Sequence, residues 1–182
     1  MSRTGPTTHR SPREYYTAHG AVPLVVSLRP ANDHAAMRRA AAAHGWRVIA
    51  LSPWKIVVQT DASTRASLRT ALAADIVIAT SPAAVRAAHT LSELRTRHRQ
   101  IFCAVGSATA AALRRVGVDD VLSPERMDSD GLLALPALHA VQGCTVGLLT
   151  APGGRDLIAP TLRERGAQVQ RADVYARKPI AC

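Results

Sequence analysis

Short apolar runs alternate along this chain with stretches that have the period of a helix. The apolar runs have the length of buried strands and comprise residues 23–28, 75–80, 101–105 and 145–150. Each leads through a turn into a predicted helix, and these helices comprise residues 33–44, 82–89, 108–116 and 155–165. Nearly continuous apolar strands that alternate with helices are typical of a parallel sheet covered on both faces. The pattern therefore predicts an α/β fold.

The turns that follow the strands are rich in small and hydroxyl-bearing residues. In a parallel α/β sheet, the turns at the carboxyl ends of the strands share one edge, where ligands bind near helix amino termini. In this chain the turns are Arg29–Pro30, Thr80–Pro82, Gly106–Thr109 and Ala151–Arg155. This edge is therefore the predicted location of a binding site.

Three of these turns have features of an anion-binding helix start. Ser107 is predicted to cap a helix, Gly106 would let the backbone approach a ligand closely, and Thr109 would present a hydroxyl beside exposed amides. Ser81, followed by proline, and Gly153–Gly154 repeat this arrangement. Serine or threonine at such a position most often only caps a helix, so no single turn is diagnostic. Several on one edge favour a site for an anionic ligand.

Two extended segments, residues 53–59 and 173–179, divide the chain into domains. Because the chain passes such a segment twice, one domain is predicted to be inserted into another. On this interpretation residues 60–172 form a complete α/β domain. Residues 21–52 begin a different domain, and the two extended segments form the linker between them.

The composition is that of a globular protein. The chain has 182 residues, of which 47% are hydrophobic, and this suffices for a buried core. No apolar run approaches the roughly 18 residues of a membrane span, and residues 1–20 have the character of a mobile basic tail rather than a signal peptide. The three cysteines lack the spacing of a disulfide framework or a metal site. We therefore expect a soluble, cytoplasmic protein.

The formal net charge of +10 favours an acidic partner. One hypothesis is a basic, non-enzymatic α/β module that binds nucleic acid or another polyanion through its arginine-rich helices and tail. The six aromatic residues (two Trp, three Tyr, one Phe) offer few platforms for base stacking, so specific nucleic-acid binding is not expected. A small-anion binder of the periplasmic type shares the predicted edge site but would need an export signal.

Taken in order, the motifs of the chain resemble the uroporphyrinogen-III synthase family. The resemblance spans most of residues 24–178, and no single motif is diagnostic. It is carried by Leu28–Pro30, Ile78–Val85, Ala104–Ala110, Asp128–Leu133, Gly153–Leu157, Leu162–Ala167 and Val174–Tyr175.

This resemblance implies a two-domain, parallel-sheet architecture with a β-linker, in which the second domain is complete and the first is partial. Family members are lyases of haem biosynthesis. They cyclise the polycarboxylate hydroxymethylbilane to uroporphyrinogen III, with loss of water and inversion of ring D. No metal or organic cofactor takes part, and a complete chain is expected to act as a monomer.

The resemblance also assigns site residues. Tyr175 matches a linker tyrosine proposed to assist departure of the substrate hydroxyl, so it is the expected catalytic residue. Arg29 is expected to point into the cleft between the domains. The remaining expected substrate-binding residues match positions that line this cleft, and they are Thr80, Ser81, Gly106, Ser107 and Thr109.

The chain departs from the family pattern in length. After Tyr175, family members continue and complete the first domain, whereas this sequence stops at Cys182. Residues 21–52 supply about two strands and one helix, which cannot bury both faces of a parallel sheet. We therefore expect exposed apolar surface in this part, a first domain that is unstable, paired or truncated, and impaired closure around the substrate.

Overall fold

The computed structural model describes residues 22–153 and 156–180, so the predicted tail at residues 1–20 lies outside it. The chain divides into two compact units. The smaller unit comprises residues 1–55 and 178–182, and the larger comprises residues 56–177. Because the units are separate compact bodies, each is described by itself.

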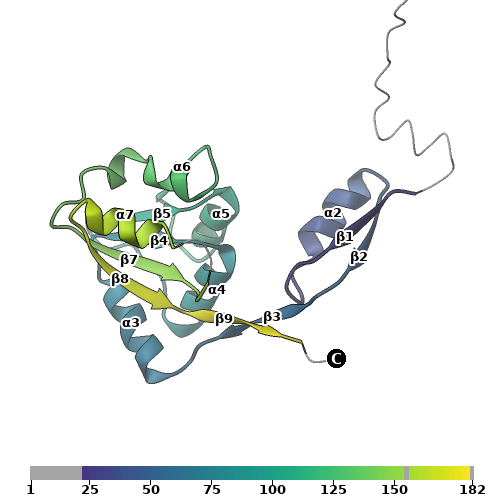
Figure 1. The fold of residues 1–182 in the computed structure, drawn as a ribbon, viewed down its shortest axis with the longest axis horizontal. Helices are drawn as coiled ribbons and strands as arrows, with labels where there is room; N and C mark the ends of the chain where they lie inside the picture. The colour runs from purple at the N-terminus through teal and green to yellow at the C-terminus, as the bar shows by residue number, and fades with distance from the viewer. Residues whose placement is uncertain (1–21, 154–155, 181–182) are drawn as a thin grey trace, which may run out of the picture. The chain divides into compact units, whose positions relative to one another are not determined.

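The smaller unit contains a single β-α-β arrangement. Strands β1 (Leu24–Ser27) and β2 (Arg47–Ala50) are parallel neighbours, and helix α2 (Ala35–Ala43) connects them (Figure 1). Side chains alternate between the faces of a strand, and here one face is open. Its exposed apolar residues are Leu24, Val26, Leu28, Ile49 and Leu51. The expected exposed apolar surface is thus confirmed, because one helix covers only one face of the strand pair.

A buried histidine ties three segments of the smaller unit together. His34 directly precedes α2 and is only 7% exposed. Its Nδ1 lies 3.0 Å from Ser27 Oγ at the end of β1, and its Nε2 lies 2.8 Å from Ser52 Oγ after β2. Both ring nitrogens therefore have hydroxyl partners, and the ring joins the carboxyl ends of both strands to the start of the helix.

The larger unit is built on a five-stranded parallel sheet with the order β6-β5-β4-β7-β8. Its strands are β4 (Ile76–Ala79), β5 (Ile101–Ala104), β6 (Val121–Leu122), β7 (Thr145–Thr150) and β8 (Gln168–Asp173). Its helices are α3 (Ala62–Leu72), α4 (Pro82–Leu91), α5 (Ser107–Arg115), α6 (Ser129–Leu133) and α7 (Ile158–Glu164), with a 3₁₀ turn at Pro136–Leu138. The prediction of an α/β fold with a parallel sheet is confirmed.

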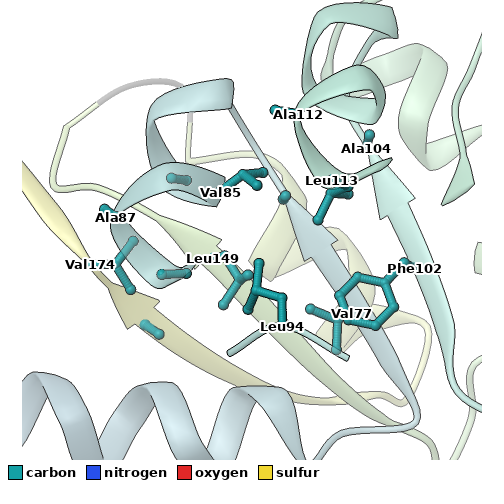
Figure 2. Packing of buried hydrophobic residues seen from close by; sticks show 14 of the residues in the cluster. Val77, Val85, Ala87, Leu94, Phe102, Ala104, Ala112, Leu113, Leu149 and Val174 are labelled. Carbon is teal, nitrogen blue, oxygen red and sulfur yellow. The ribbon is translucent and has the colours of Figure 1, made fainter. Parts of the chain in front are cut away.

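Both faces of this sheet are buried. On one face Val77, Phe102 and Leu149 pack with residues of α3, α4 and α5 (Figure 2). On the other, Ile78 and Cys103 pack with residues of α6 and α7. Full burial of a large aliphatic or aromatic side chain contributes about 1.5–3 kcal/mol, so these two layers are the main source of the unit's stability. The burial that raises the pKa of the Cys103 thiol to about 12 also keeps this thiol neutral.

One glycine sets the distance between a helix and the sheet. A Cβ atom added to Gly147 in β7 would collide with the backbone carbonyl of Ala71 in α3. Because backbone cannot move aside as a flexible side chain can, α3 lies against β7 only with glycine at this position.

Strands β3 (Trp54–Val58) and β9 (Tyr175–Pro179) form a separate two-stranded sheet. The Gln59 amide donates to the Val174 carbonyl, and the Ile180 amide donates to that of Pro53, so the strands are antiparallel. Both strands contain residues of both units. These elements fall within the segments that the sequence predicts to be extended.

Candidate functional site

The carboxyl edge of the large sheet carries a cavity of about 390 Å³. We call it the Tyr175 pocket. It lies wholly within the larger unit. Its lining includes Thr80, Ser81, Val105, Asp128, Thr150, Gly153, Tyr175 and Arg177. Three of the expected site residues, Thr80, Ser81 and Tyr175, therefore meet in one cavity.

Ser81 begins helix α4 in the predicted way. Its backbone is extended, its Oγ accepts a hydrogen bond from the Ala84 amide at 3.1 Å, and Pro82 occupies the first turn. The neighbouring Thr80 joins two strands, because its amide donates to the Leu149 carbonyl and its Oγ1 lies 3.1 Å from Thr150 Oγ1. The hydroxyls of Thr80 and Ser81 are thus held directly after the end of β4, and that of Thr80 lies beside the end of β7.

Tyr175 is the most buried residue of the described pocket lining. It is 2% exposed and belongs to the larger hydrophobic core cluster. Its Oη lies 3.2 Å from Ser81 Oγ and accepts a hydrogen bond from Arg177 Nη2 at 3.3 Å. The Arg177 guanidinium carbon lies 5.7 Å from the centre of the tyrosine ring, within cation–π range. A phenol, a hydroxyl and a cation therefore adjoin one another at the cavity.

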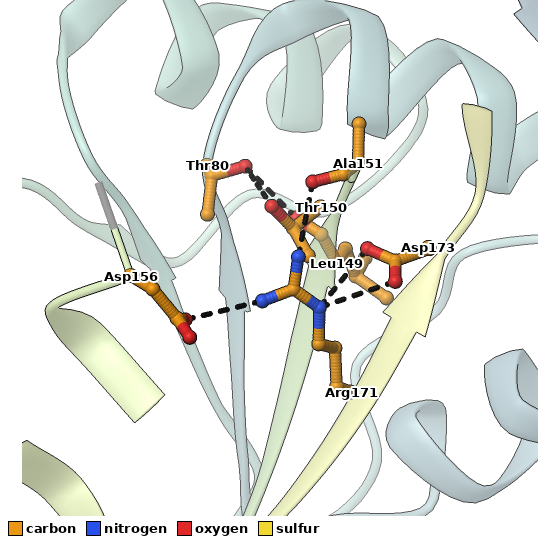
Figure 3. A network of polar contacts seen from close by, with 7 residues as sticks. All are labelled: Thr80, Leu149, Thr150, Ala151, Asp156, Arg171 and Asp173. Carbon is orange, nitrogen blue, oxygen red and sulfur yellow. Dashed lines mark hydrogen bonds and ion pairs between the residues drawn. The ribbon is translucent and has the colours of Figure 1, made fainter. Parts of the chain in front are cut away.

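A second cavity of about 440 Å³ lies beside the Tyr175 pocket and shares Thr80, Thr150 and Gly153 with it. We call it the Arg171 pocket. Its arginine is held from three sides (Figure 3). Arg171 Nε donates to both oxygens of Asp173 at 3.0 and 3.2 Å, Nη1 to Asp156 at 3.3 Å and Nη2 to the Ala151 carbonyl at 3.1 Å. These contacts fasten the segment after β7 to strand β8.

The turn at Gly106 differs from its prediction. The helix-capping position belongs to Gly106, so Ser107 is the first helical residue and its hydroxyl donates to Met127 Sδ at 3.3 Å. Thr109 is only 4% exposed, so it does not present its hydroxyl at the surface. The predictions that Ser107 caps the helix and that Thr109 offers an exposed hydroxyl are wrong, because α5 starts one residue earlier and these side chains point elsewhere. The described lining of the Tyr175 pocket includes their neighbour Val105 but not Gly106, Ser107 or Thr109.

One other expected feature of the edge also differs. Gly153 lines both cavities, but helix α7 begins at Ile158 after Leu157, and not at the predicted residue 155. Gly154 and Arg155 themselves lie outside the described residues. The expected role of Arg29 stays a prediction; this residue belongs to the smaller unit, where its exposed guanidinium forms an ion pair with Asp33 at 3.3 Å.

Sequence reasoning missed Arg177 and Arg171. Arg177 stands two positions after Tyr175 in β9, and Arg171 stands two positions before Asp173 in β8. Residues two apart in a strand point to the same face, so this spacing was a usable signal.

Taken together, these contacts show what the Tyr175 pocket can do chemically. It can bind an anion with hydroxyls and the Arg177 guanidinium, and the Tyr175 phenol can offer a proton to a bound oxygen atom.

Comparison with known proteins gives consistent results. The model of the family described as uroporphyrinogen-III synthase HemD matches residues 35–181. The uroporphyrinogen-III synthase of Salmonella typhimurium is 36% identical over 107 residues, which are 57% of this chain and 44% of that protein. The Escherichia coli protein of the same name is 40% identical over 80 residues, which are 43% of this chain and 32% of that protein. This chain thus spans less than half the length of these curated relatives.

The fold is also found among solved structures. A mutant uroporphyrinogen III synthase from Thermus thermophilus superposes with a TM-score of 0.62 at 21% identity, covering 88% of this chain and 64% of that one. No helix in the described part of this chain is long and apolar enough to cross a membrane.

Proposed function

Because the chain belongs to the uroporphyrinogen-III synthase family, we propose that it takes part in the cyclisation of hydroxymethylbilane to uroporphyrinogen III. This lyase reaction expels water and inverts ring D. The observation that carries the proposal is the meeting of Thr80, Ser81 and Tyr175 in one cavity at the carboxyl edge of the sheet. This chain spans less than half the length of the curated relatives described above. The cyclisation is therefore proposed for a protein as long as those relatives, and substrate binding in the Tyr175 pocket is proposed for this chain.

The substrate is a polycarboxylate, and the pocket suits such a ligand. A helix amino terminus stabilises a nearby anion by about 0.3–1 kcal/mol, and a hydrogen bond to a charged group contributes about 1.5–3 kcal/mol. Micromolar affinity corresponds to about 8 kcal/mol. A few such contacts, made by Thr80, Ser81 and the adjoining amides, would therefore suffice to hold the substrate.

Tyr175 is proposed to act as the general acid. As the bond between carbon and the substrate hydroxyl breaks, the Tyr175 proton passes to the departing oxygen, which leaves as water. The carbon that is set free then bonds to the substituted position of ring D, which gives a spiro intermediate. The older bond from this position to its methylene group breaks, and that methylene bonds to the free α position of ring D, so that ring D is inverted. The proton that the pyrroles release on completing the macrocycle restores the phenol, so that water is the only by-product.

Most of the rate enhancement would come from holding the chain of pyrroles in a folded conformation. Hydroxymethylbilane closes unaided to the unrotated isomer, so the protein must favour one geometry over another. Anchored carboxylates achieve this, because they fix the rings relative to Tyr175.

The alternative function, a basic module that binds nucleic acid, is not favoured by the family match. It predicts retention on generic DNA that weakens steeply with salt. The synthase proposal instead predicts selective binding of carboxylated tetrapyrroles, so the two can be separated by a competition between DNA and uroporphyrin III.

The direct test supplies fresh hydroxymethylbilane to the purified protein and separates the product isomers, with the Escherichia coli synthase as the positive control. Formation of the type III isomer above the uncatalysed background supports the proposal. Exclusive formation of the type I isomer, together with no binding of uroporphyrin III by the chain, would overturn it.

A further inference from the structure

The two neighbouring pockets each contain an arginine, and the two arginines are in opposite states. Arg171 is neutralised by the carboxylates of Asp156 and Asp173. Arg177 forms no ion pair with any carboxylate of the described residues, and it donates a hydrogen bond to the uncharged Oη of Tyr175. The lining of the Tyr175 pocket therefore carries a positive charge that can pair with an anionic ligand.

Tyr175 holds the Arg177 guanidinium in place but occupies only part of its hydrogen-bonding capacity. One nitrogen donates to Tyr175 Oη at 3.3 Å, and the guanidinium carbon lies 5.7 Å from the ring centre. A guanidinium has five N–H donors in a planar fork. The hydrogen bond to Tyr175 uses one of them, so further donors remain for a ligand that enters the pocket.

The acid in the pocket lining does not serve as this counter-ion. Asp128 Oδ2 accepts a hydrogen bond from Arg126 Nε at 2.6 Å, and Asp128 Oδ1 accepts one from the Gly131 amide at 2.8 Å. The other uncharged polar side chains of the described lining all carry hydroxyls; they are Thr80, Ser81, Ser129, Thr150 and Tyr175. A cation surrounded by hydroxyls fits a planar carboxylate, which accepts two parallel hydrogen bonds from arginine.

We propose that Arg177 binds one carboxylate of the substrate in the Tyr175 pocket and thereby places the reacting end of the substrate against the Tyr175 hydroxyl. This inference rests on the proposed function and extends it to a residue and a ligand group. Since a guanidinium only donates, Tyr175 Oη accepts from Arg177. The tyrosine hydrogen is therefore directed away from Arg177, toward Ser81 or the bound substrate.

The test measures the Kd of the chain for uroporphyrin III by fluorescence titration. Arg177→Gln removes the charge at nearly constant size, and Arg177→Lys keeps the charge but loses the fork. Arg115→Gln is the matched control, because Arg115 is exposed and lies in the last turn of α5, far along the helix from the edge where α5 begins. Circular dichroism of each variant checks that the fold is intact.

We expect Arg177→Gln to raise Kd by about tenfold to a hundredfold, the range for a lost hydrogen bond to a charged group. Arg177→Lys should give an intermediate Kd, and Arg115→Gln should match the wild type. Equal Kd values for Arg177→Gln and Arg115→Gln would overturn the role of Arg177 while leaving the proposed function standing. Failure of the wild-type chain to bind uroporphyrin III would instead count against the proposed function, and this inference would fall with it.

Discussion

The two units contain the same local arrangement, a parallel strand pair joined by a helix, but the strands have different surroundings. In the larger unit, the β4-α4-β5 arrangement lies within a sheet covered on both faces, and Val77 of β4 is fully buried. In the smaller unit, Val26 of β1 is 54% exposed on an open face. The same residue type in the same kind of strand thus contributes differently, because burial depends on neighbours that local sequence does not supply.

This difference bears on function. The cavity that gathers Thr80, Ser81 and Tyr175 is formed by the covered sheet, whose strand ends are fixed by two packed layers. A binding site needs side chains held in place. The larger unit meets this need by itself, whereas in the described part of the smaller unit one face of the strand pair stays exposed.

The largest expected effect is on catalysis within the larger unit. Tyr175→Phe removes the phenolic hydroxyl but keeps the ring that packs in the core. Loss of general acid catalysis should lower the turnover to the type III isomer by about a hundredfold or more. The assay uses the form of the protein, this chain or the longer one, that makes the type III isomer. Uroporphyrin III binding should change little. A wild-type rate in this variant would remove Tyr175 from the mechanism.

A matched pair of substitutions compares the two sheets directly. Val77→Ala in β4 should lower the free energy of unfolding by about 2 kcal/mol, because it leaves a cavity in a closed core. Val26→Ala in β1 should change it by less than about 0.5 kcal/mol, because that side chain is already in water. Urea unfolding measures both. Equal losses would mean that the face of β1 is covered in solution.

Within the smaller unit, His34→Ala should have a local effect. It removes the contacts to Ser27 and Ser52, and each hydrogen bond contributes about 0.5–1.5 kcal/mol. Amide hydrogen exchange should accelerate in β1 and β2 and stay unchanged in β4 and β7. Unaltered exchange in β1 would show that the histidine does not hold this unit together.

The smallest effect depends on pH. Hydrogen bonds from the Thr145 side chain and backbone lower the pKa of Asp75 below its ordinary value of 3.8. The folded state therefore gains stability from this carboxylate at neutral pH, and loses that gain as the pH falls below about 3.8 toward the lowered folded pKa.

Asp75→Asn should consequently be less stable than the wild type at pH 7, and the difference in free energy of unfolding should shrink as the pH falls below about 3.8. Thr145→Val should flatten the pH dependence in the same way, since it removes one of the donors. Unfolding curves at several pH values provide the measurement. A stability difference that is constant with pH would contradict the assignment.

Much of the fold could be predicted from the sequence, because buried parallel strands have a distinctive apolar pattern. The strand at residues 145–150 matches β7, and helix α4 starts at the predicted Pro82. The predicted start of α7 was wrong. Gly153–Gly154 suggested a helix from residue 155, but α7 begins at Ile158, and the Ala151 carbonyl before it accepts a hydrogen bond from Arg171. A contact between distant segments of the chain has no local signature.

The site was predicted in part for a similar reason. Ser81 keeps its predicted role because a serine before proline has few alternatives at a helix start. The predicted cap at Ser107 and the predicted exposed hydroxyl of Thr109 were wrong because a helix turns by about 100° per residue, so a shift of one position in its start redirects every side chain. Arg177 was overlooked although its spacing from Tyr175 was visible.

The most direct test of the central claim maps where a carboxylated tetrapyrrole binds. Amide chemical shifts of the isotope-labelled chain are followed by NMR as uroporphyrin III is added. We predict the largest shifts at the residues that line the Tyr175 pocket, namely residues 80, 81, 150, 151, 153, 175 and 177. Shifts concentrated at Asp75 and Thr145, at the opposite ends of β4 and β7, would contradict the claim that the substrate binds at the carboxyl edge.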